Sequence, residues 1–546
     1  MTAWLHHVTA LPIVVPLLSA AVLLFFSEPR RLPRALIALA STLIQAAAAG
    51  TLLWMTSHPA SGAAPDGILV YSIGSWPAPY GIVLVADRLA AVMLALTAAI
   101  ALPVVVYSFA QWDRLGVYYH PLFQLLLMGV NGAFLTGDLF NLFVFFEILL
   151  AASYGLLMHG GGTARVTSSL HYIAVNLAAS LIFLIGVAVI YGAAGTLNLA
   201  DLAAHWDEAS PQDRRLLDGG LAVLAVAFLI KGGIWPLNFW LPTAYSAAAA
   251  PVVAVFSILT KVGVYSIVRV GFMVDPSKPV LYGGSLLFAA AIATMAVGSL
   301  GALAARHPPR LIAFSVIVSA GTVLAALALG SASTLAPALF YLVISAPATA
   351  AAFLVAGMAA RMQMHSVTAV LDRDGAEATY TAFDVGEPAR SSASMDDDEV
   401  GFIIPAGVAF LGLAFLSCGL LVAGLPPLAG FLAKVSLIVA ALGSLGVVQH
   451  PAHVWVLVVA LLGASLAALL AFLRIGVRLF WTARETTRPR VRMLEAVPVA
   501  FLVLVGIGLT VMAGPVMTYL TAAARALHQP DAYIHAVLAT SKPVQP

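Results

Sequence analysis

Charged residues are scarce in this chain: Asp, Glu, Lys and Arg make up 9% of 546 residues. An average soluble domain has roughly 25%. This shortage excludes a soluble enzyme, a disordered protein and a nucleic-acid binder. Cysteine is scarcer still, because Cys418 is the one cysteine in the sequence. A single cysteine excludes an intrachain disulfide and a cysteine-based metal cluster.

Apolar residues, by contrast, make up 62% of the chain. They occur in runs of about 20 residues, the length of a bilayer-spanning helix, and do not alternate with polar residues as in a transmembrane β-barrel. We therefore predict an all-α polytopic membrane protein with about fourteen transmembrane helices. The predicted spans are residues 8–26, 33–57, 81–110, 121–137, 138–158, 169–192, 220–241, 252–273, 281–304, 309–330, 335–360, 402–446, 453–481 and 496–519.

The placement of arginine and lysine predicts the orientation of these spans. With an outward N-terminus, the inward loops contain the arginine-rich stretches 30–34 and 484–492. We therefore expect both termini on the periplasmic side of a bacterial cytoplasmic (inner) membrane. The acidic loop 361–400 would then be cytoplasmic, as a solvated linker or, alternatively, as an antechamber that attracts cations. Residues 195–218 are expected to include a surface helix.

Three lysines, Lys231, Lys261 and Lys434, lie inside predicted spans, and among the acidic residues Glu147 alone lies deep in a span. A charge at a helix centre costs about 2.5–3.5 kcal/mol, so four cost roughly 10–14 kcal/mol, comparable with the net stability of a whole protein. One carboxylate cannot neutralise three ammonium groups. Some of these lysines are therefore expected to be neutral part of the time or in contact with water, which makes them candidates for proton transfer. The alternative is a buried ion pair that only holds helices together.

Glycine and proline interrupt two spans, just after Lys231 and just before Lys434. The residues that break these helices are Gly232, Gly233, Pro236, Pro426 and Pro427. Such breaks at membrane depth occur where they line a wet cavity, and a matching pair indicates an inverted-repeat transporter. The interrupted spans are the seventh and the twelfth, so spans 4–8 and 9–13 are predicted to be inverted copies. A kinked structural helix is the alternative for either break.

This repeat predicts four segments along the chain. They are 1–120 with helices 1–3, 121–273 as the first antiporter repeat with helices 4–8, 281–481 as the second inverted repeat with helices 9–13 and the cytoplasmic acidic loop 361–400, and 482–546 with helix 14 and a C-terminal tail.

Five motifs, in order, resemble the antiporter-like membrane subunits. These are the D subunits of Mrp/Pha-type multisubunit cation/proton antiporters and the proton-pumping subunits of respiratory complex I. The motifs are Gly137–Ile148, Phe228–Lys231 with Trp235-Pro236, Lys261–Tyr265 with Arg269, Arg310–Ser315, and Pro426-Pro427 with Lys434. The stretch 145–157 is most similar to the Mrp/Pha D type. The resemblance implies a fold of fourteen helices with two inverted five-helix repeats and broken helices 7 and 12.

The resemblance also implies a pathway for protons along Glu147, Lys231, Lys261 and Lys434. Glu147 would keep Lys231 charged while the two are close, and its withdrawal would expel the proton towards Lys261. The hydroxyl groups expected to help are Ser257, Thr260, Ser315, Ser319 and Ser345. The eleventh span of the respiratory relatives usually carries a histidine, often followed by a lysine. This chain has Ser345 and Thr349 in that span instead, so we expect hydroxyl groups and water to carry the proton there.

Three further sites stay open at this point. His171 either gates proton entry or is a hydrogen-bonded structural histidine. Asp138 is expected at the outer interface of its span, with or without a role in the pathway. Asp87 and Arg88 are adjacent and are expected to form a structural pair.

The resulting hypothesis is a proton-translocating subunit of a multisubunit Na⁺ (or K⁺)/H⁺ antiporter, a secondary transporter subunit rather than an enzyme. Its expected partners are the other subunits of that complex, membrane lipids, and the transported protons and Na⁺ or K⁺, without nucleic acid. No cofactor and no metal site are expected, and we expect a partner subunit to contribute the cation site. The alternatives are a proton-pumping subunit of a respiratory NADH:quinone oxidoreductase or membrane-bound hydrogenase, and a scaffold. A scaffold explains none of the charge at mid-membrane.

Overall fold

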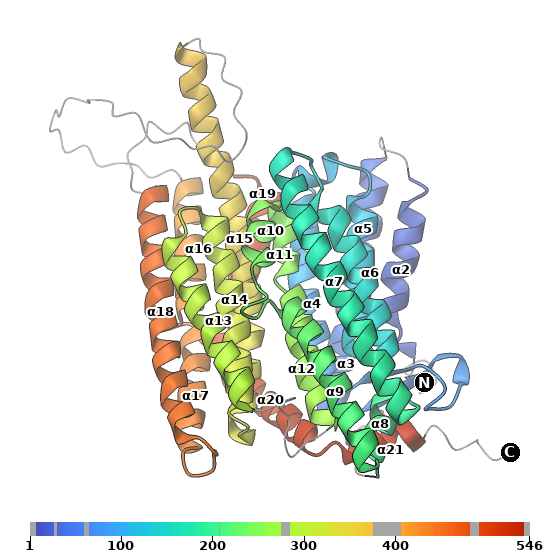
Figure 1. Cartoon of the computed structure of the whole chain (residues 1–546). Helices are drawn as coiled ribbons and strands as arrows, with labels where there is room; N and C mark the ends of the chain where they lie inside the picture. The colour runs from blue at the N-terminus through green and yellow to red at the C-terminus, as the bar shows by residue number, and fades with distance from the viewer. Residues whose placement is uncertain are drawn as a thin grey trace.

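In the computed structural model of the chain, residues 7–26, 30–58, 65–206, 208–274, 284–374, 406–480 and 491–539 are described. Long helices run side by side along one common direction (Figure 1). In these residues, eleven helices are long and apolar enough to cross a membrane, and α2 (Leu11–Leu23) and α17 (Ala429–Gly443) are shorter apolar helices. The all-α membrane fold is confirmed, whereas the number fourteen and the two inverted repeats stay predictions.

The helices of the N-terminal half overlap the predicted spans. After α2 come α3 (Arg31–Ser57), β1 (Leu69–Ser72), β2 (Val83–Ala86), α4 (Arg88–Ser108), α5 (Tyr119–Leu135), α6 (Leu139–Leu157), α7 (Thr163–Ala194), α8 (Leu199–His205), α9 (Pro211–Gly232), α10 (Trp240–Ala247), α11 (Ala250–Phe256) and α12 (Leu259–Val274). Helix α9 begins at Pro211 instead of residue 220, and the span predicted over 81–110 begins with strand β2 before α4 starts at Arg88. The expected surface helix within 195–218 is α8. The antiparallel hairpin β1–β2 was not expected, because its strands are only four residues long.

The C-terminal half continues with α13 (Gly284–Ala304), α14 (Pro308–Ala328), α15 (Ala332–Asp374), α16 (Ala406–Ala423), α17, α18 (Pro451–Phe480), α19 (Met493–Val511), α20 (Ala513–His528) and α21 (Asp531–Leu538). Two expectations need correction here. Helix α15 continues to Asp374, into the stretch expected as a linker, and residues 375–405 of that stretch lie outside the described residues. The expected C-terminal tail contains the helices α20 and α21.

Helix α20 lies across one end of the bundle instead of continuing along it (Figure 1). It packs against α15, α4 and α12. The Tyr519 hydroxyl donates to the Arg88 carbonyl oxygen at 3.1 Å and is hydrogen-bonded to the Thr56 hydroxyl at 2.9 Å. α20 therefore ties both halves of the chain together at this end.

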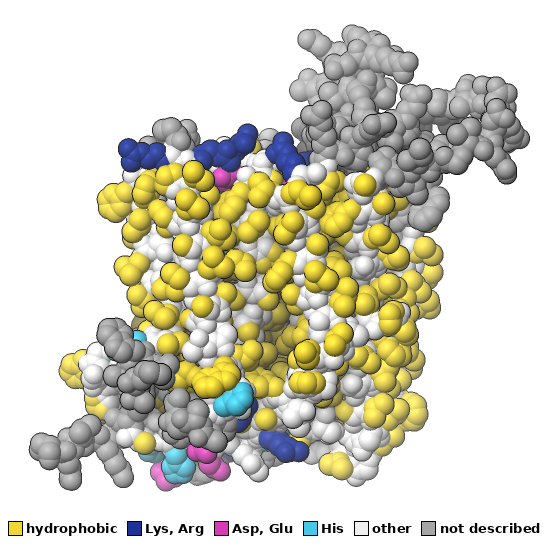
Figure 2. Space-filling model, turned by 180° about the vertical axis from the view of Figure 1, so that it is seen from behind, with side chains coloured by type: hydrophobic (Ala, Val, Ile, Leu, Met, Phe, Trp, Pro, Cys, Tyr) yellow, Lys and Arg dark blue, Asp and Glu magenta, His cyan; other side chains and the backbone are white. Residues whose placement is uncertain are grey.

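Burial and surface both fit a bilayer. The most apolar parts of Ala250–Val274 and Ala332–Arg361 are completely buried. Helices α11, α12 and α15 therefore lie at the centre of the bundle. Figure 2 shows hydrophobic side chains over the middle of one face and charged side chains gathered at its two ends. The start of α2 and helix α21 lie at the same end of the bundle, and the C-terminal end of α15 projects from the opposite end (Figure 1).

Three pairs of consecutive helices are interrupted inside the bundle. α9 ends at Gly232 and α10 begins at Trp240; α11 ends at Phe256 and α12 begins at Leu259; α16 ends at Ala423 and α17 begins at Ala429. Gly233 and Gly424 have φ of +70° and +72°, a backbone conformation that favours glycine. The first and third interruptions hold the glycines and prolines singled out in the sequence.

Candidate functional site

Glu147 and Lys231 are connected through a third side chain, Ser180. Glu147 comes from α6, Ser180 from α7 and Lys231 from the last turn of α9. The Ser180 hydroxyl donates to Glu147 Oε1, and Lys231 Nζ donates to Ser180 Oγ at 3.2 Å. Among the described residues, Glu147 forms no direct ion pair with a lysine. The hydroxyl thus accepts from the ammonium and donates to the carboxylate, which is the orientation that a proton relay requires.

The interruption after Lys231 fixes the position of this lysine. The Trp240 indole Nε1 donates to the Ile230 carbonyl at 3.2 Å, and the Trp235 backbone N–H donates to Thr294 Oγ1 at 2.8 Å. On the other side, a Cβ added to Gly263 would lie 2.6 Å from the Gly232 nitrogen. Glycine at 263 therefore allows α12, which carries Lys261, to pack directly against the break.

Lys261 lies deep inside the bundle, with 1% of its surface exposed. Its Nζ donates to Ser319 Oγ of α14, and the Ser319 hydroxyl donates in turn to the Val316 carbonyl at 2.7 Å. Thr260 Oγ1 is buried and has no hydrogen-bond partner among the described residues. The expected hydroxyls of Ser257 and Ser315 donate to carbonyls of their own helices, those of Ala254 and Leu311. Of the expected hydroxyl groups in the described ranges, Ser319 is the one in contact with a pathway lysine.

Lys434 binds the end of the helix that precedes it. Its Nζ donates to the carbonyl oxygens of Val422 at 3.2 Å and Ala423 at 2.9 Å, and to Ser465 Oγ at 2.8 Å. In a continuous α-helix those two carbonyls would accept from the N–H groups four residues later. The residues there are Pro426 and Pro427, which have no N–H. The two prolines therefore free the carbonyls that hold the ammonium, and the negative end of the helix dipole adds to the attraction.

Asp87 pairs with Arg269 of α12, and not with its neighbour Arg88 as expected. Arg269 Nη1 and Nη2 donate to the two carboxylate oxygens of Asp87 at 2.7 and 2.6 Å. Arg269 Nε donates to the Tyr265 hydroxyl at 3.1 Å, and Asp87 also caps α4 by accepting from the Ala90 N–H at 2.9 Å. Sequence adjacency misled here because residues 87 and 88 begin a helix and point in different directions.

The other predicted candidates form hydrogen bonds that do not involve the lysines. His171 is exposed on α7, and its Nδ1 is hydrogen-bonded to the Thr167 carbonyl at 3.0 Å. Asp138 caps α6 by accepting from the Asn141 N–H at 2.8 Å. Ser345 donates to the Leu342 carbonyl of its own helix at 3.2 Å. None of these contacts joins a lysine of the pathway.

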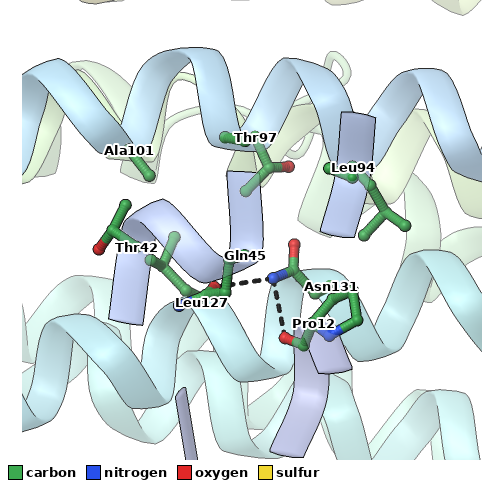
Figure 3. A pocket seen from close by; sticks show the side chains of 10 residues that line it. Pro12, Thr42, Gln45, Leu94, Thr97, Ala101, Leu127 and Asn131 are labelled. Carbon is green, nitrogen blue, oxygen red and sulfur yellow. Dashed lines mark hydrogen bonds between the residues drawn. The ribbon is translucent and has the colours of Figure 1, made fainter. Parts of the chain in front are cut away.

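An uncharged polar cluster among α2, α3 and α5 was missed in the sequence (Figure 3). Pro16 has no N–H, so the Pro12 carbonyl lacks its partner within α2. Asn131 Nδ2 donates to this carbonyl at 3.0 Å and to Gln45 Oε1 at 3.1 Å, and Gln45 Nε2 donates to Gln124 Oε1 at 3.0 Å. Because these groups satisfy one another, the cluster holds the first helices together.

Interrupted helices around buried lysines define an ion-translocating membrane protein. The family described as NADH:quinone oxidoreductase/Mrp antiporter, TM, matches residues 136–373. The chain is 47% identical to the probable K⁺/H⁺ antiporter D subunit of Rhizobium meliloti (strain 1021), over 99% of both chains. It is 33% identical to the Na⁺/H⁺ antiporter D subunit of Bacillus subtilis (strain 168), over 98% of this chain and 100% of that one.

Solved structures of antiporter-like membrane subunits are also similar to this chain. A chain of the Mrp complex from Dietzia sp. DQ12-45-1b matches with a TM-score of 0.78 and 28% identity, over 98% of this chain and 100% of that one. A chain of respiratory complex I from Thermus thermophilus shares the fold, with a TM-score of 0.72 at 21% identity over 97% and 99% of the two chains. The protein belongs to the family of cation/proton antiporter D subunits, which confirms the resemblance seen in its motifs. It is part of a membrane transporter and not an enzyme.

Proposed function

We propose that this chain is the proton-translocating subunit of a multisubunit Na⁺ or K⁺/H⁺ antiporter, which uses inward proton flow to drive cation efflux and pH homeostasis. The observation that carries the proposal is the Glu147–Ser180–Lys231 chain of hydrogen bonds within the helix bundle. The names of the similar subunits support a cation/proton exchange. A redox-driven pump has weaker support, because the similarity to the complex I chain, at 21% identity, concerns the fold alone.

The proposed mechanism follows from electrostatics. While Glu147 is bound to Ser180 beside Lys231, the carboxylate stabilises the ammonium charge, which is otherwise unfavourable in a buried site. Movement or protonation of Glu147 removes that stabilisation, and Lys231 releases its proton towards Lys261. Lys261 and Lys434, each bound to a serine hydroxyl, pass it on. Each lysine then alternates between a charged and a neutral state, and Glu147 sets the timing of the first transfer.

Other subunits complete the proposed transporter. The similar proteins are named as subunits, and we propose that one of the partners contributes the site for Na⁺ or K⁺, while lipids surround the apolar faces. In the described part of the chain, no group of three or more His, Cys, Asp or Glu side chains could hold a metal ion. The four sequence segments, with an interrupted helix in each of the two proposed repeats, are part of the same proposal.

The first prediction is that exchange depends on these partners. The whole complex in inverted vesicles should show proton movement on addition of Na⁺ or K⁺, measured by dequenching of a pH-sensitive dye. The purified chain alone in liposomes should show little, because the cation site is incomplete. Robust cation-dependent proton movement by the single chain would refute the dependence on partner subunits. A whole complex without cation-dependent proton movement would refute the antiporter function.

The second prediction concerns topology in the bacterial cytoplasmic membrane. We propose that both termini are periplasmic and that loop 361–400 is cytoplasmic, because the arginine-rich stretches then face inward. Fusions after residue 380 and after residue 539 test this with two reporters. Green fluorescent protein should fluoresce only in the first fusion, and alkaline phosphatase should be active only in the second. The reverse pattern would invert the orientation, and equal patterns at both positions would contradict the three predicted crossings between residues 380 and 539.

A further inference from the structure

The proposed pathway has a gap between Lys261 and Lys434. Ser345 and Thr349 of α15 were expected to fill it. Their hydroxyls instead donate within α15, from Ser345 to the Leu342 carbonyl and from Thr349 to the carbonyls of Ser345 and Ala346. In the described contacts, neither hydroxyl reaches a lysine. These two hydroxyls therefore form no direct connection between the two lysines.

Two buried hydroxyl groups follow each other along α14. Ser319 accepts the hydrogen bond from Lys261, and Thr322 lies three residues further along, on the same face of the helix. Thr322 donates to the Val318 carbonyl at 2.9 Å, so its oxygen keeps lone pairs for another donor. Tyr341 is buried on the neighbouring helix α15, which packs against α14. No direct hydrogen bond between the Thr322 and Tyr341 hydroxyls is found among the described residues, so the step between them requires a water molecule.

Tyr341 also reaches the last lysine. Helix α15 packs against both α14 and α17. Lys434 Nζ of α17 lies 6.0 Å from the centre of the Tyr341 ring, at the outer limit of a cation–π contact. Tyr341 is 5% exposed, Thr322 1% and Ser319 2%, so the three side chains form a buried polar line across α14 and α15. That line begins at Lys261 and ends beside Lys434.

We propose that Tyr341, together with Thr322, conducts the proton between Lys261 and Lys434 in the place where the eleventh span has neither histidine nor lysine. The inference rests on the proposed function. The phenol oxygen accepts a proton on one side while its own O–H proton leaves on the other, so one O–H bond forms as one breaks and the phenol is unchanged. Water bridges any step longer than a direct hydrogen bond.

The test uses the whole complex in inverted vesicles with matched variants. Tyr341→Phe keeps the ring beside Lys434 and removes only the hydroxyl. Its maximal exchange rate should fall at least about tenfold, because a positioned proton-transfer group contributes about 10²–10⁴-fold and water replaces part of it. The cation concentration at half-maximal rate should stay unchanged. Tyr341→His should recover a measurable part of the rate, because imidazole can both accept and donate a proton. Ser333→Ala, which removes an exposed hydroxyl from the same helix, is the control and should keep the wild-type rate.

Lys434→Met and the unaltered complex are measured alongside, with assembly checked by immunoblot. An inactive Lys434→Met with a fully active Tyr341→Phe would overturn this inference and leave the proposed function standing. Full activity of Lys434→Met, or no exchange by the unaltered complex, would overturn the proposed function itself. If Tyr341→Phe does not assemble, the exchange rate of Thr322→Val tests the inference instead. This variant keeps Tyr341 and removes the Thr322 hydroxyl from the proposed pathway. A wild-type rate in that variant would also overturn the inference.

Discussion

Replacing Lys231 by arginine in the assembled complex is expected to abolish cation/proton exchange, although the positive charge is kept. A guanidinium group does not deprotonate in proteins, so it can hold the charge beside Ser180 but cannot release the proton. Lys231→Met, which keeps the length and loses the proton site, should be equally inactive. Glu147→Asp should retain partial activity and Glu147→Gln almost none. The measurement is dye dequenching in inverted vesicles that contain the whole complex, with immunoblots for assembly.

The contrasting outcome is well defined. If Lys231 only balanced the charge of Glu147, arginine would be tolerated and methionine would destabilise the protein by leaving the partly buried Glu147 carboxylate without its counter-charge. Full activity of an assembled Lys231→Arg complex would end the relay hypothesis at this position. Arg215→Lys is the matched control, because Arg215 is an exposed residue of the same helix. That substitution should leave exchange unchanged.

A second large effect is expected at the ion pair between Asp87 and Arg269. Asp87→Asn keeps a side chain that can cap α4 and removes the negative charge. It leaves the buried guanidinium without its counter-charge, and breaking such a pair typically costs about 3–5 kcal/mol. We expect a marked loss of assembled complex and a lower midpoint of thermal unfolding, measured by size-exclusion chromatography with fluorescence detection after heating.

Two variants make this prediction specific. Asp138→Asn also alters a helix-capping aspartate, but no ion pair of Asp138 is found in the described residues, so it should unfold near the wild-type temperature. Asp87→Asn combined with Arg269→Met removes both charges and should recover part of the lost stability, because an apolar replacement of a buried pair is often tolerated. Wild-type stability of Asp87→Asn alone would show that the pair contributes little.

The charged residues and the helix breaks of the site could be predicted from the sequence because their signals are local. A lysine inside an apolar run, or two prolines in a row, is unusual wherever it occurs. Ser180 could not be predicted, since it is one polar residue among several in a long apolar helix and its role depends on two other helices. The same holds for Arg269, whose partner lies 182 positions away in the chain.

The fold, too, could be predicted only where the sequence signal is local. Runs of apolar residues predict the long helices, whereas the sequence of α20 does not predict a span, because its apolar residues cover only one face of the helix. Tyr341 was overlooked for a different reason. Tyrosine in a span usually serves packing, and only the position of α15 between α14 and α17 places the Tyr341 ring near Lys434.

The carbonyl oxygens of Val422 and Ala423 can accept hydrogen bonds from the N–H groups of a continuous helix or from the ammonium of Lys434. The two kinds of donor compete for the same oxygens. Any residue other than proline at 426 or 427 would restore an N–H group that competes with the lysine for the same oxygen. Glycine at 424 is bound to this arrangement too, since a Cβ there would lie 2.6 Å from Lys434 Cδ. Gly424, Pro426, Pro427 and Lys434 therefore depend on one another. A substitution that makes the helix continuous removes the carbonyl oxygens that accept from Lys434.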